Sequence, residues 1–429
     1  MAATDVWTRI PRFEDTINPT DILISQQLER LCRECLLRYN DDVNPIATSM
    51  IEALREKNVT AGVTKVTGGI TNSLFKVEFS GLEDNATSPA SNAPTDSTTG
   101  SSCEIDNEGS RPDHLPVCLV RIFGEAGSSI IDRDEENRIF NHLSTIGFGP
   151  TLFGIFQNGR IEEFFTRLRP LEPLEMVSEK WTPLIARRLR YMHSLKPAMV
   201  EDGPNVPDLW RTIESYAAKG RELFNASPED EEGDFMTMLD SVEREAKWLE
   251  RTIQSRETAN VCPLEQIVFC HNDLLSGNIL VPKDGSNCQL KFIDYEYCAF
   301  NPAAADIANH FAAVVESMLI VNDDYDVEKY FPSKELQLLF LRNYLTEDEY
   351  SSLDEGTMLE TIRLYAMAAE LRWCAWSVIQ HFEQDRSAAA VEQGCDDDED
   401  DEDAAFDYEN YGKARLQGYF DLKNSTTEY

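Results

Sequence analysis

The stretch 268–311 reads VFCHNDLLSGNILVPKDGSNCQLKFIDYEYCAFNPAAADIANHF, the pattern of a strand, a polar turn, a short apolar run, a hairpin, a second strand and a loop. Its ionisable residues stand where the apolar runs break. His271, Asp273 and Asn278 mark the first break, and Asp294 ends the alternating run QLKFID. Acid and amide groups at the ends of short strands can hold a metal ion against a phosphate. The stretch therefore predicts a site for metal and phosphate chemistry.

The spacing within this stretch makes the prediction more specific. Asp273 and Asn278 are five positions apart, as are the aspartate and asparagine in the HRDLxxxN catalytic loop of protein kinases. In that loop the aspartate accepts the proton of a hydroxyl and the asparagine binds magnesium. Asp294 takes the place of the DFG aspartate. The alternative is a polar loop that Asp273 and Asn278 merely cap, and the presence of all these groups on two adjacent expected strands favours catalysis.

Composition bounds the class of protein. A chain of 429 residues can form two lobes, and its hydrophobic fraction of 42% is ordinary for a globular enzyme. We expect no secretory signal, no stable membrane insertion and a cytoplasmic location. The net charge of −38, of which the run DDDEDDED at 396–403 supplies eight charges, argues against nucleic acid as a partner. The ten cysteines are expected to be reduced, with zinc at Cys32 and Cys35 as the less favoured alternative.

The first half of the chain has the signals of a nucleotide-binding sheet. Residues 63–66 and 74–79 have strand character, and Gly68 and Gly69 interrupt them as at the tip of a hairpin. Backbone amides at such a tip can approach a phosphate, because glycine has no side chain. Three neighbouring residues could add polar contacts: Thr71, Asn72 and Ser73. The stretch 82–116 loses its apolar period, which predicts a disordered insertion.

Arg121 is the single charged residue in the apolar run PVCLVRIFG, and such a cation needs an anion. Glu135 or Glu136, in the helix-like segment that follows, could pair with it, as the strand lysine pairs with a helix glutamate in kinases. The alternative is a surface salt bridge of little energetic value. A hairpin over GPTLFGIFQNGRIEEFF then leads out of this lobe, where its backbone could face adenine. We place the domain boundary between 165 and 166.

Several motifs jointly resemble the choline/ethanolamine kinase family. These are HNDLLSGNIL, FIDYEY, Asn301, Asp306 and ANHF in the second half, with GGITNSLF, VRIFG, RDEENRIF and GRIEEFF in the first half in the right order. The resemblance implies an α+β, protein-kinase-like bilobal fold of the aminoglycoside phosphotransferase type. Its small β-rich N-lobe would span 1–165, and its larger α-rich C-lobe would span 166–429, with 396–403 as an acidic disordered insertion.

The resemblance also implies roles for individual residues. The catalytic residues would be Asp273, as the base, with His271 and Asn278, while Asn278 and Asp294 would hold Mg²⁺ on the phosphates of ATP. Arg121 would contact phosphate and be oriented by Glu136. The other cofactor-binding residues would be Gly68, Gly69, Thr71, Asn72, Ser73, Glu163 and Phe165, and the residues that brace the catalytic loop would be Asp306 and His310.

Aromatic residues near the C-terminus suggest the substrate. Trp373 and Trp376 are three apart, as are Tyr408 and Tyr411, which alone would indicate a helical core stripe. In the resembled family such positions line an ammonium pocket, and ring faces attract cations within about 6 Å of their centroid. The resemblance therefore assigns the substrate to these four residues together with Tyr325 and Glu296.

Two departures from the family pattern affect the substrate pocket. The family has an acidic residue two positions after NHF, whereas this chain has Ala313 there, so Glu316 is a candidate substitute. Arg372 is an unexpected cation directly before the first tryptophan of the pair.

The resulting prediction is an ethanolamine kinase that uses ATP and Mg²⁺ and makes phosphoethanolamine, the first step of the CDP-ethanolamine route to phosphatidylethanolamine. The alternatives are a choline kinase and a catalytically silent kinase-like scaffold. The sequence leaves the oligomeric state open, including a homodimer.

Overall fold

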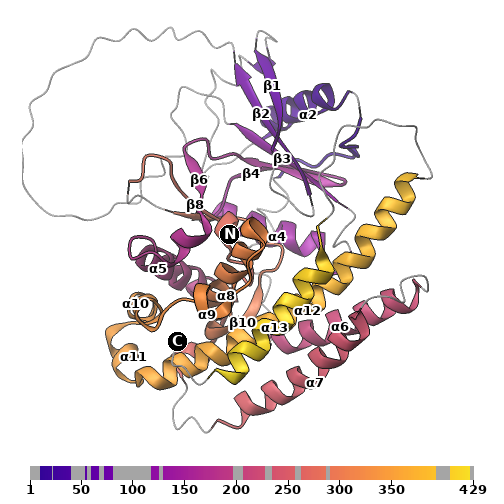
Figure 1. Ribbon diagram of the computed structural model, residues 1–429. Coiled ribbons are helices and arrows are strands. Elements are labelled where there is room, and N and C mark those ends of the chain that lie inside the picture. The colour runs from indigo at the N-terminus through magenta and orange to yellow at the C-terminus, as the bar shows by residue number, and fades with distance from the viewer. Residues whose placement is uncertain are drawn as a thin grey trace, which may run out of the picture. The chain divides into compact units, whose positions relative to one another are not determined.

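The structure is a computed structural model of the chain (Figure 1). It describes residues 10–21, 23–39, 54–55, 59–66, 72–80, 117–124, 129–196, 206–227, 234–256, 262–286, 290–392 and 406–425. Gly68, Gly69 and Thr71 lie outside the described residues, as do the stretches 82–116 and 396–403. Two compact units divide the chain: Met1–Phe123 with Leu143–Thr166, and Gly124–His142 with Arg167–Tyr429.

The first unit is built on an antiparallel five-stranded sheet with the strand order β1-β2-β3-β5-β4. The strands are β1 (Thr60–Val66), β2 (Asn72–Ser80), β3 (Cys118–Phe123), β4 (Leu152–Phe156) and β5 (Gly159–Glu163). β1 and β2 pair from Val66 opposite Leu74 outward, so the expected hairpin strands are present. Helix α2 (Ile24–Arg38) presents a buried stripe that joins the same hydrophobic core as the sheet.

Cys32 and Cys35 belong to that buried stripe of α2, and both thiols are inside the core. Burial raises the pKa of both thiols well above the ordinary value. Among the described residues, neither thiol belongs to a group of three His, Cys, Asp or Glu side chains close enough to share a metal ion. All seven cysteines in the described part of the chain are free.

The second unit is mainly helical. Its helices are α4 (Arg133–Thr145, of which residues up to 142 belong to this unit), α5 (Thr182–Ser194), α6 (Leu209–Asn225), α7 (Phe235–Gln254), α8 (Ala303–Asn322), α9 (Val327–Tyr330), α10 (Lys334–Tyr344), α11 (Glu347–Ser351), α12 (Glu355–Glu392) and α13 (Tyr408–Asn424). Short 3-10 turns are η1 (Pro173–Val177), η3 (Pro263–Glu265) and η4 (Ser276–Asn278).

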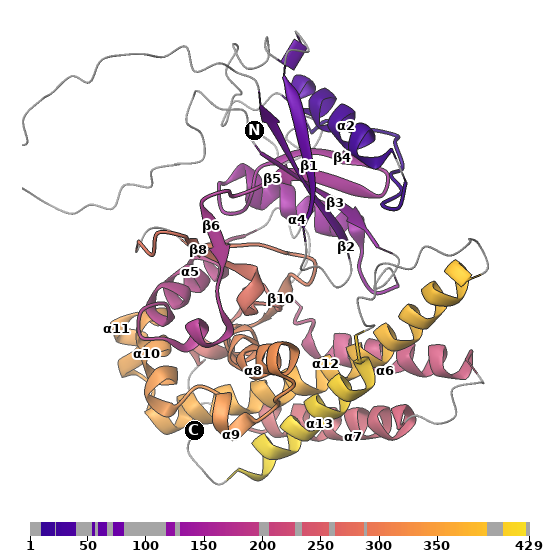
Figure 2. The ribbon, with the colours of Figure 1, turned by 45° about the horizontal axis from the view of Figure 1, so that its top comes forward.

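Helices α12 and α8 form the centre of this unit. α12 packs against α13, α6, α7 and α8, and Figures 1 and 2 both show it alongside α13. Residues 364–380 of α12 are all buried. α8 is long and apolar enough to cross a membrane, yet 83% of its apolar window is buried inside the protein. It is therefore the core helix of a folded unit.

Two small sheets carry the polar turn that the sequence singled out. β7 (Ile267–Cys270) pairs antiparallel with β10 (Ala299–Pro302), and β8 (Ile279–Pro282) lies between β6 (Leu168–Pro170) and β9 (Lys291–Phe292). The turn therefore connects β7 to β8, and Asp294 follows β9 by two residues, which confirms the expected order of strand, turn and strand.

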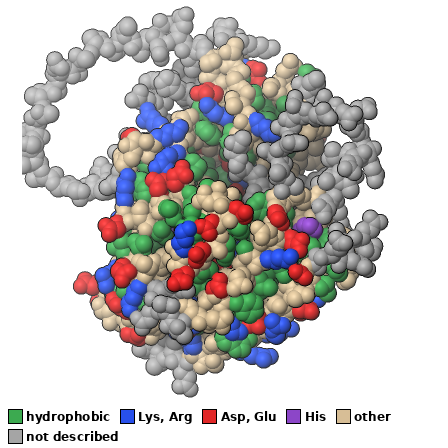
Figure 3. Space-filling model, viewed as in Figure 1, with side chains coloured by type: hydrophobic (Ala, Val, Ile, Leu, Met, Phe, Trp, Pro, Cys, Tyr) green, Lys and Arg blue, Asp and Glu red, His purple; other side chains and the backbone are tan. Residues whose placement is uncertain are grey.

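On the face drawn in Figure 3, acidic and basic side chains are interspersed.

Candidate active site

Asn272 anchors the turn between β7 and β8. Its φ of 63° lies in the left-handed region, which is uncommon for a residue other than glycine. Its backbone N–H donates to Asp306 Oδ1 (2.7 Å), and its carbonyl accepts from Arg372 Nη1 (2.9 Å). Its side chain donates to the carbonyl of Tyr297 (2.9 Å) and accepts from Asn301 Nδ2 (3.0 Å). These contacts hold a strained conformation and thereby fix the position of the next residue, Asp273.

Asp306, in the first turn of α8, is fully buried and organises the same turn. Its Oδ2 accepts from the backbone N–H of His271 (2.7 Å) and lies 2.9 Å from His193 Nε2. Burial alone would raise the pKa of this carboxyl, but its hydrogen bond and attraction to His193, with a weaker contribution from His271, lower the pKa below its usual value. Asp306 therefore stays ionised and holds the turn between β7 and β8, and the bracing of a catalytic loop that the resemblance implies for it stays a prediction.

The imidazole rings of His271 and His310 each donate a hydrogen bond to a backbone carbonyl. His271 Nε2 donates to the carbonyl of Ile293 (3.0 Å), which connects the turn to the residue just before Asp294. His310 Nδ1 donates to the carbonyl of Leu274 (2.8 Å). Burial lowers the pKa of His271, and it lowers that of His310 to about 4. Both rings are neutral near pH 7, so this geometry suits His271 to positioning.

Asp273 and Asn278 meet as their spacing suggested. Asn278 Nδ2 donates both to the backbone carbonyl of Asp273 (2.8 Å) and to its Oδ2 (3.0 Å). Burial raises the pKa of Asp273 well above its usual value, and the negative charges of Glu316, Asp294 and Glu296 add to this effect. A raised pKa suits a carboxylate to accept a proton. A cation placed among these carboxylates would bring the pKa of Asp273 down again.

Three carboxylates form a compact group beside this turn. Glu136 of α4, Asp294 and Glu296 can each offer an oxygen, all within 4.8 Å of one another. Arg133 donates to Glu136 (2.8 Å) and to Glu296 (2.9 Å), which compensates part of their charge. Oxygen ligands of this kind suit Mg²⁺. The residues present therefore fit the metal that the sequence implied, with Asp294 held at a φ of 68°.

The other expected cofactor residues lie in the first unit. Arg121 of β3 is only 5% exposed and lies 3.8 Å from Glu162 of β5, so it is not a surface salt bridge. Glu163 ends β5 and accepts from the N–H and hydroxyl of Thr151 (3.1 and 2.8 Å). Asn72 and Ser73 begin β2 and Phe165 follows β5. Pairing of Arg121 with Glu136 stays a prediction, because these residues belong to different units.

Four of the five expected aromatic residues form one cluster in the second unit, and the fifth, Tyr325, donates to Glu370 Oε2 (2.6 Å). Ring centroids of Trp373 and Trp376 are 5.4 Å apart, and Trp376 lies 5.7 Å from Tyr408 and 5.9 Å from Tyr411. All four side chains are buried. The rings come from α12 and α13, two helices that pack along each other. A three-residue spacing on each helix therefore brings both pairs to a shared interface.

A buried network of charges adjoins the aromatic cluster. Glu316 of α8 accepts from Tyr411 Oη (2.7 Å) and from Arg415 Nη1 (3.1 Å). Glu370 of α12 forms an ion pair with Arg415 Nε (2.7 Å) and accepts from Tyr325 Oη (2.6 Å). Burial raises the pKa of Glu370 to about 7, against the opposing effect of Arg415. When both glutamates are ionised, the two carboxylates carry one negative charge more than the guanidinium of Arg415 balances.

Sequence reasoning missed four members of these networks: Asn272, Glu370, Asn309 and Arg415. Asn309 connects the turn that contains Asn272 to the aromatic cluster, because it donates to the carbonyl of Asn272 (3.2 Å) and accepts from Trp373 Nε1 (2.7 Å). A signal existed for Glu370, which is a lone acid in the apolar helical run YAMAAEL. The polar partners of Asn309 and Arg415 are far away in the sequence, so no local pattern predicts that these two residues belong to a buried network.

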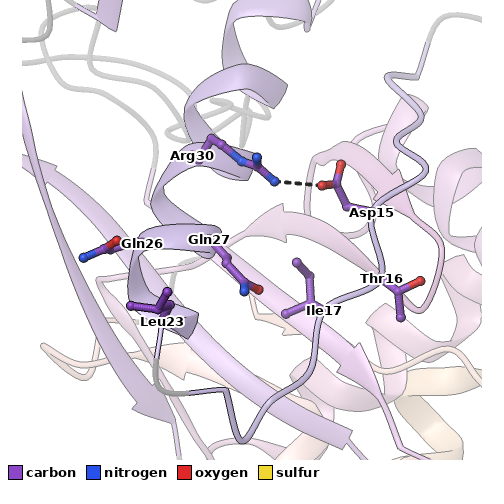
Figure 4. A pocket seen from close by; sticks show the side chains of 7 residues that line it. All are labelled: Asp15, Thr16, Ile17, Leu23, Gln26, Gln27 and Arg30. Carbon is purple, nitrogen blue, oxygen red and sulfur yellow. Dashed lines mark hydrogen bonds and ion pairs between the residues drawn. The ribbon is translucent and has the colours of Figure 1, made fainter.

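A separate surface hollow lies in the first unit (Figure 4). The residues that line it are Asp15, Thr16, Ile17, Leu23, Gln26, Gln27 and Arg30. Arg30 and Asp15 form an ion pair of 2.8 Å across it. It contains none of the residues that the sequence singled out.

The first unit and the carboxylate-rich turn of the second define a class. An antiparallel sheet in one unit, with an Asp and Asn pair on a strand-linking turn and a further Asp after the next strand in the other, is the arrangement of a phosphotransferase with a protein-kinase-like fold. The sequence model of the choline/ethanolamine kinase family matches residues 63–420. The chain belongs to that family, and it is a kinase.

Individual relatives support the family and carry both substrate names. "Probable choline kinase 3" of Arabidopsis thaliana is 32% identical over 269 residues, which cover 62% of this chain and 71% of that protein. "Probable ethanolamine kinase A" of Dictyostelium discoideum is 28% identical over 370 residues, covering 84% and 85%. The crystal structure of a choline kinase from Cryptosporidium parvum Iowa II has a TM-score of 0.64 at 21% identity, covering 93% and 95%, and shows the shared fold.

Proposed function

We propose that the protein transfers the γ-phosphoryl group of ATP to the hydroxyl of ethanolamine, with Mg²⁺ as the metal. The product, phosphoethanolamine, would be the first intermediate of the CDP-ethanolamine route to phosphatidylethanolamine, made in the cytoplasm. The observation that carries the choice of substrate is Glu316, a buried carboxylate that touches Tyr411 and lies near enough to raise the pKa of Asp273.

In the proposed reaction, Asp273 accepts the hydroxyl proton of the alcohol as the oxygen attacks the γ-phosphorus, and the bond from that phosphorus to the β–γ bridging oxygen breaks and releases ADP. Asn278 holds Asp273 by two hydrogen bonds from its Nδ2, so that the carboxylate oxygen keeps a fixed direction. Asn278, Asp294 and the nearby glutamates would hold the magnesium, which supplies positive charge against the phosphate oxygens. His271, His310 and Asp306 act through the backbone by holding the turn in place. Catalysis then rests on positioning and electrostatics.

The proposal assigns ATP binding to the lobe before residue 166. Arg121, inside the sheet, would contact a phosphate, and Glu163 and Phe165 stand where the chain leaves the sheet. Asn72 and Ser73 begin β2 directly after the glycine-containing segment, whose residues Gly68, Gly69 and Thr71 are assigned to the phosphates on sequence grounds.

Hydrogen-bonding capacity distinguishes the two candidate alcohols. Protonated ethanolamine offers three N–H donors, whereas the quaternary ammonium of choline offers none. Glu316 lies three residues beyond Ala313 on α8, hence on the same helical face. Its carboxylate can therefore take the place of the acid that the family pattern puts at Ala313. A free lone pair of Glu316 would bond an ammonium N–H, while Trp376 and Tyr411 contribute ring faces.

Parallel turnover measurements test this proposal. ADP release is followed with ATP, Mg²⁺ and either ethanolamine or choline, over a range of alcohol concentrations. We expect a higher kcat/KM for ethanolamine. A higher value for choline would identify the protein as a choline kinase. The absence of ADP release with any small amino alcohol would instead support a silent kinase-like scaffold.

A further inference from the structure

Arg372 brings a second cation into the aromatic cluster. This residue of α12 is 6% exposed, and its Cζ lies 4.8 Å from the ring centroid of Trp373 and 5.4 Å from that of Tyr297. Both distances are within the range of a cation–π interaction. The guanidinium therefore occupies aromatic surface next to the proposed alcohol site.

A hydrogen bond holds this guanidinium in place. Arg372 Nη1 donates to the carbonyl of Asn272 (2.9 Å), one residue before Asp273, so the cation is attached to the catalytic turn itself. Swinging the side chain away would break that bond and leave a buried carbonyl with one donor fewer, Asn309 alone. Arg372 is therefore a fixed part of the site.

The position of Arg372 limits what Trp373 can offer to a substrate. Trp373 Nε1 already donates to Asn309 Oδ1 (2.7 Å), and its ring meets those of Trp376 and Tyr297 edge to face. With a guanidinium beside the same ring, a second cation there would meet like-charge repulsion in a buried setting. The aromatic surface left for an ammonium group is that of Trp376 and the two tyrosines of α13, beside Glu316.

We propose that Arg372 determines specificity by excluding a quaternary ammonium from the aromatic cluster while admitting a primary ammonium. This inference rests on the proposed function, because it concerns the same alcohol site. A trimethylammonium group depends on ring faces for its binding energy, since it cannot donate to a carboxylate. A primary ammonium is smaller and gains hydrogen bonds at Glu316, so it depends less on the rings that Arg372 covers.

Replacement of Arg372 tests the inference. Arg372→Met removes the charge and keeps an unbranched side chain of similar length. We expect the ratio of kcat/KM for choline to kcat/KM for ethanolamine to rise roughly tenfold, equivalent to about 1.4 kcal/mol, mainly through a lower KM for choline. Arg372→Lys keeps a cation near the rings and should leave the ratio near that of the wild type. Arg363→Met removes another arginine of α12, one that pairs with Glu360, and should leave the ratio unchanged.

A purely structural role would give a different result. If Arg372 only positions the Asn272 carbonyl, Arg372→Met lowers kcat for both alcohols equally and the ratio stays constant, which would overturn the inference. Arg372→Gln can still donate to that carbonyl without a charge, so it should raise the ratio even if Arg372→Met folds poorly. The two dissociation constants, measured by calorimetry, give the same ratio without turnover. The wild-type preference tests the proposed function separately, whichever way the variants behave.

Discussion

Replacement of the buried carboxylate Asp306 by asparagine would test how the turn between β7 and β8 is held. The carboxylate accepts from two backbone N–H groups, those of His271 and Asn272, and interacts with His193. Asparagine has one acceptor oxygen, and its NH₂ group would have to face one of these N–H donors. The variant loses at least one charge-assisted hydrogen bond, about 1.5–3 kcal/mol, and leaves a buried N–H unpaired, about 1–3 kcal/mol. We therefore expect Asp306→Asn to lower the free energy of unfolding by roughly 3–5 kcal/mol.

Urea unfolding at pH 7.5, followed by tryptophan fluorescence, measures this loss. Five of the six tryptophans report on the second unit: Trp181, Trp210, Trp248, Trp373 and Trp376. Asp326→Asn is the matched control, because Asp326 caps the exposed helix α9 and asparagine caps about equally well. Because the folded pKa of Asp306 is depressed, its contribution is present above its ordinary pKa and is lost as the pH falls through the folded value. A loss below about 1 kcal/mol at pH 7.5 would refute the assigned role.

Two further predictions concern the buried network next to the aromatic cluster. Glu316→Gln keeps an acceptor for Tyr411 but removes the negative charge. The KM for ethanolamine should therefore rise roughly tenfold to a hundredfold, which corresponds to the loss of one charged hydrogen bond, and the KM for choline should rise much less. Equal changes in KM for both alcohols in the ADP-release assay would exclude a direct contact between Glu316 and the ammonium group. Glu370 has a folded pKa of about 7, whereas its ordinary pKa is 4.5; the charged or ionisable groups around it are Arg415, Tyr325, Glu316 and Asp421. Its favourable contribution to the free energy of unfolding is therefore complete below pH 4.5 and is lost as the pH rises to 7. Relative to Glu370→Gln, the wild type should lose about 3 kcal/mol of unfolding free energy between pH 4.5 and pH 7.5, and a constant difference across that range would show that Glu370 titrates normally.

The sequence predicted the parts of the fold and site that depend on local patterns. The alternation and breaks in 268–311 placed Asp273, Asn278 and Asp294 at the ends of short strands, and the structure has those strands. The hairpin strands around 67–71 are also present, because apolar alternation and a glycine pair are local signals.

The unpredicted parts depend on contacts between distant segments. Glu316 on α8 and Arg415 on α13 are 99 residues apart along the chain, and only the packing of helices places them within hydrogen-bonding distance. Arg372 was unexpected beside the aromatic pair. No local pattern shows that its side chain donates to the carbonyl of Asn272, 100 residues earlier in the chain. The left-handed backbone conformation of Asn272 likewise cannot be predicted from the local sequence, because the hydrogen-bond partners that hold it come from four other segments.

The central claim is that Asp273 serves as the base for phosphoryl transfer to an amino alcohol. The most direct test is ethanolamine-dependent ADP release by the wild type and by Asp273→Asn, with saturating ATP and Mg²⁺ and with circular dichroism to confirm folding. We predict turnover by the wild type and a fall in kcat of roughly 10²–10⁴-fold in the variant, the usual contribution of a general base. Wild-type turnover by a folded Asp273→Asn variant would contradict the account.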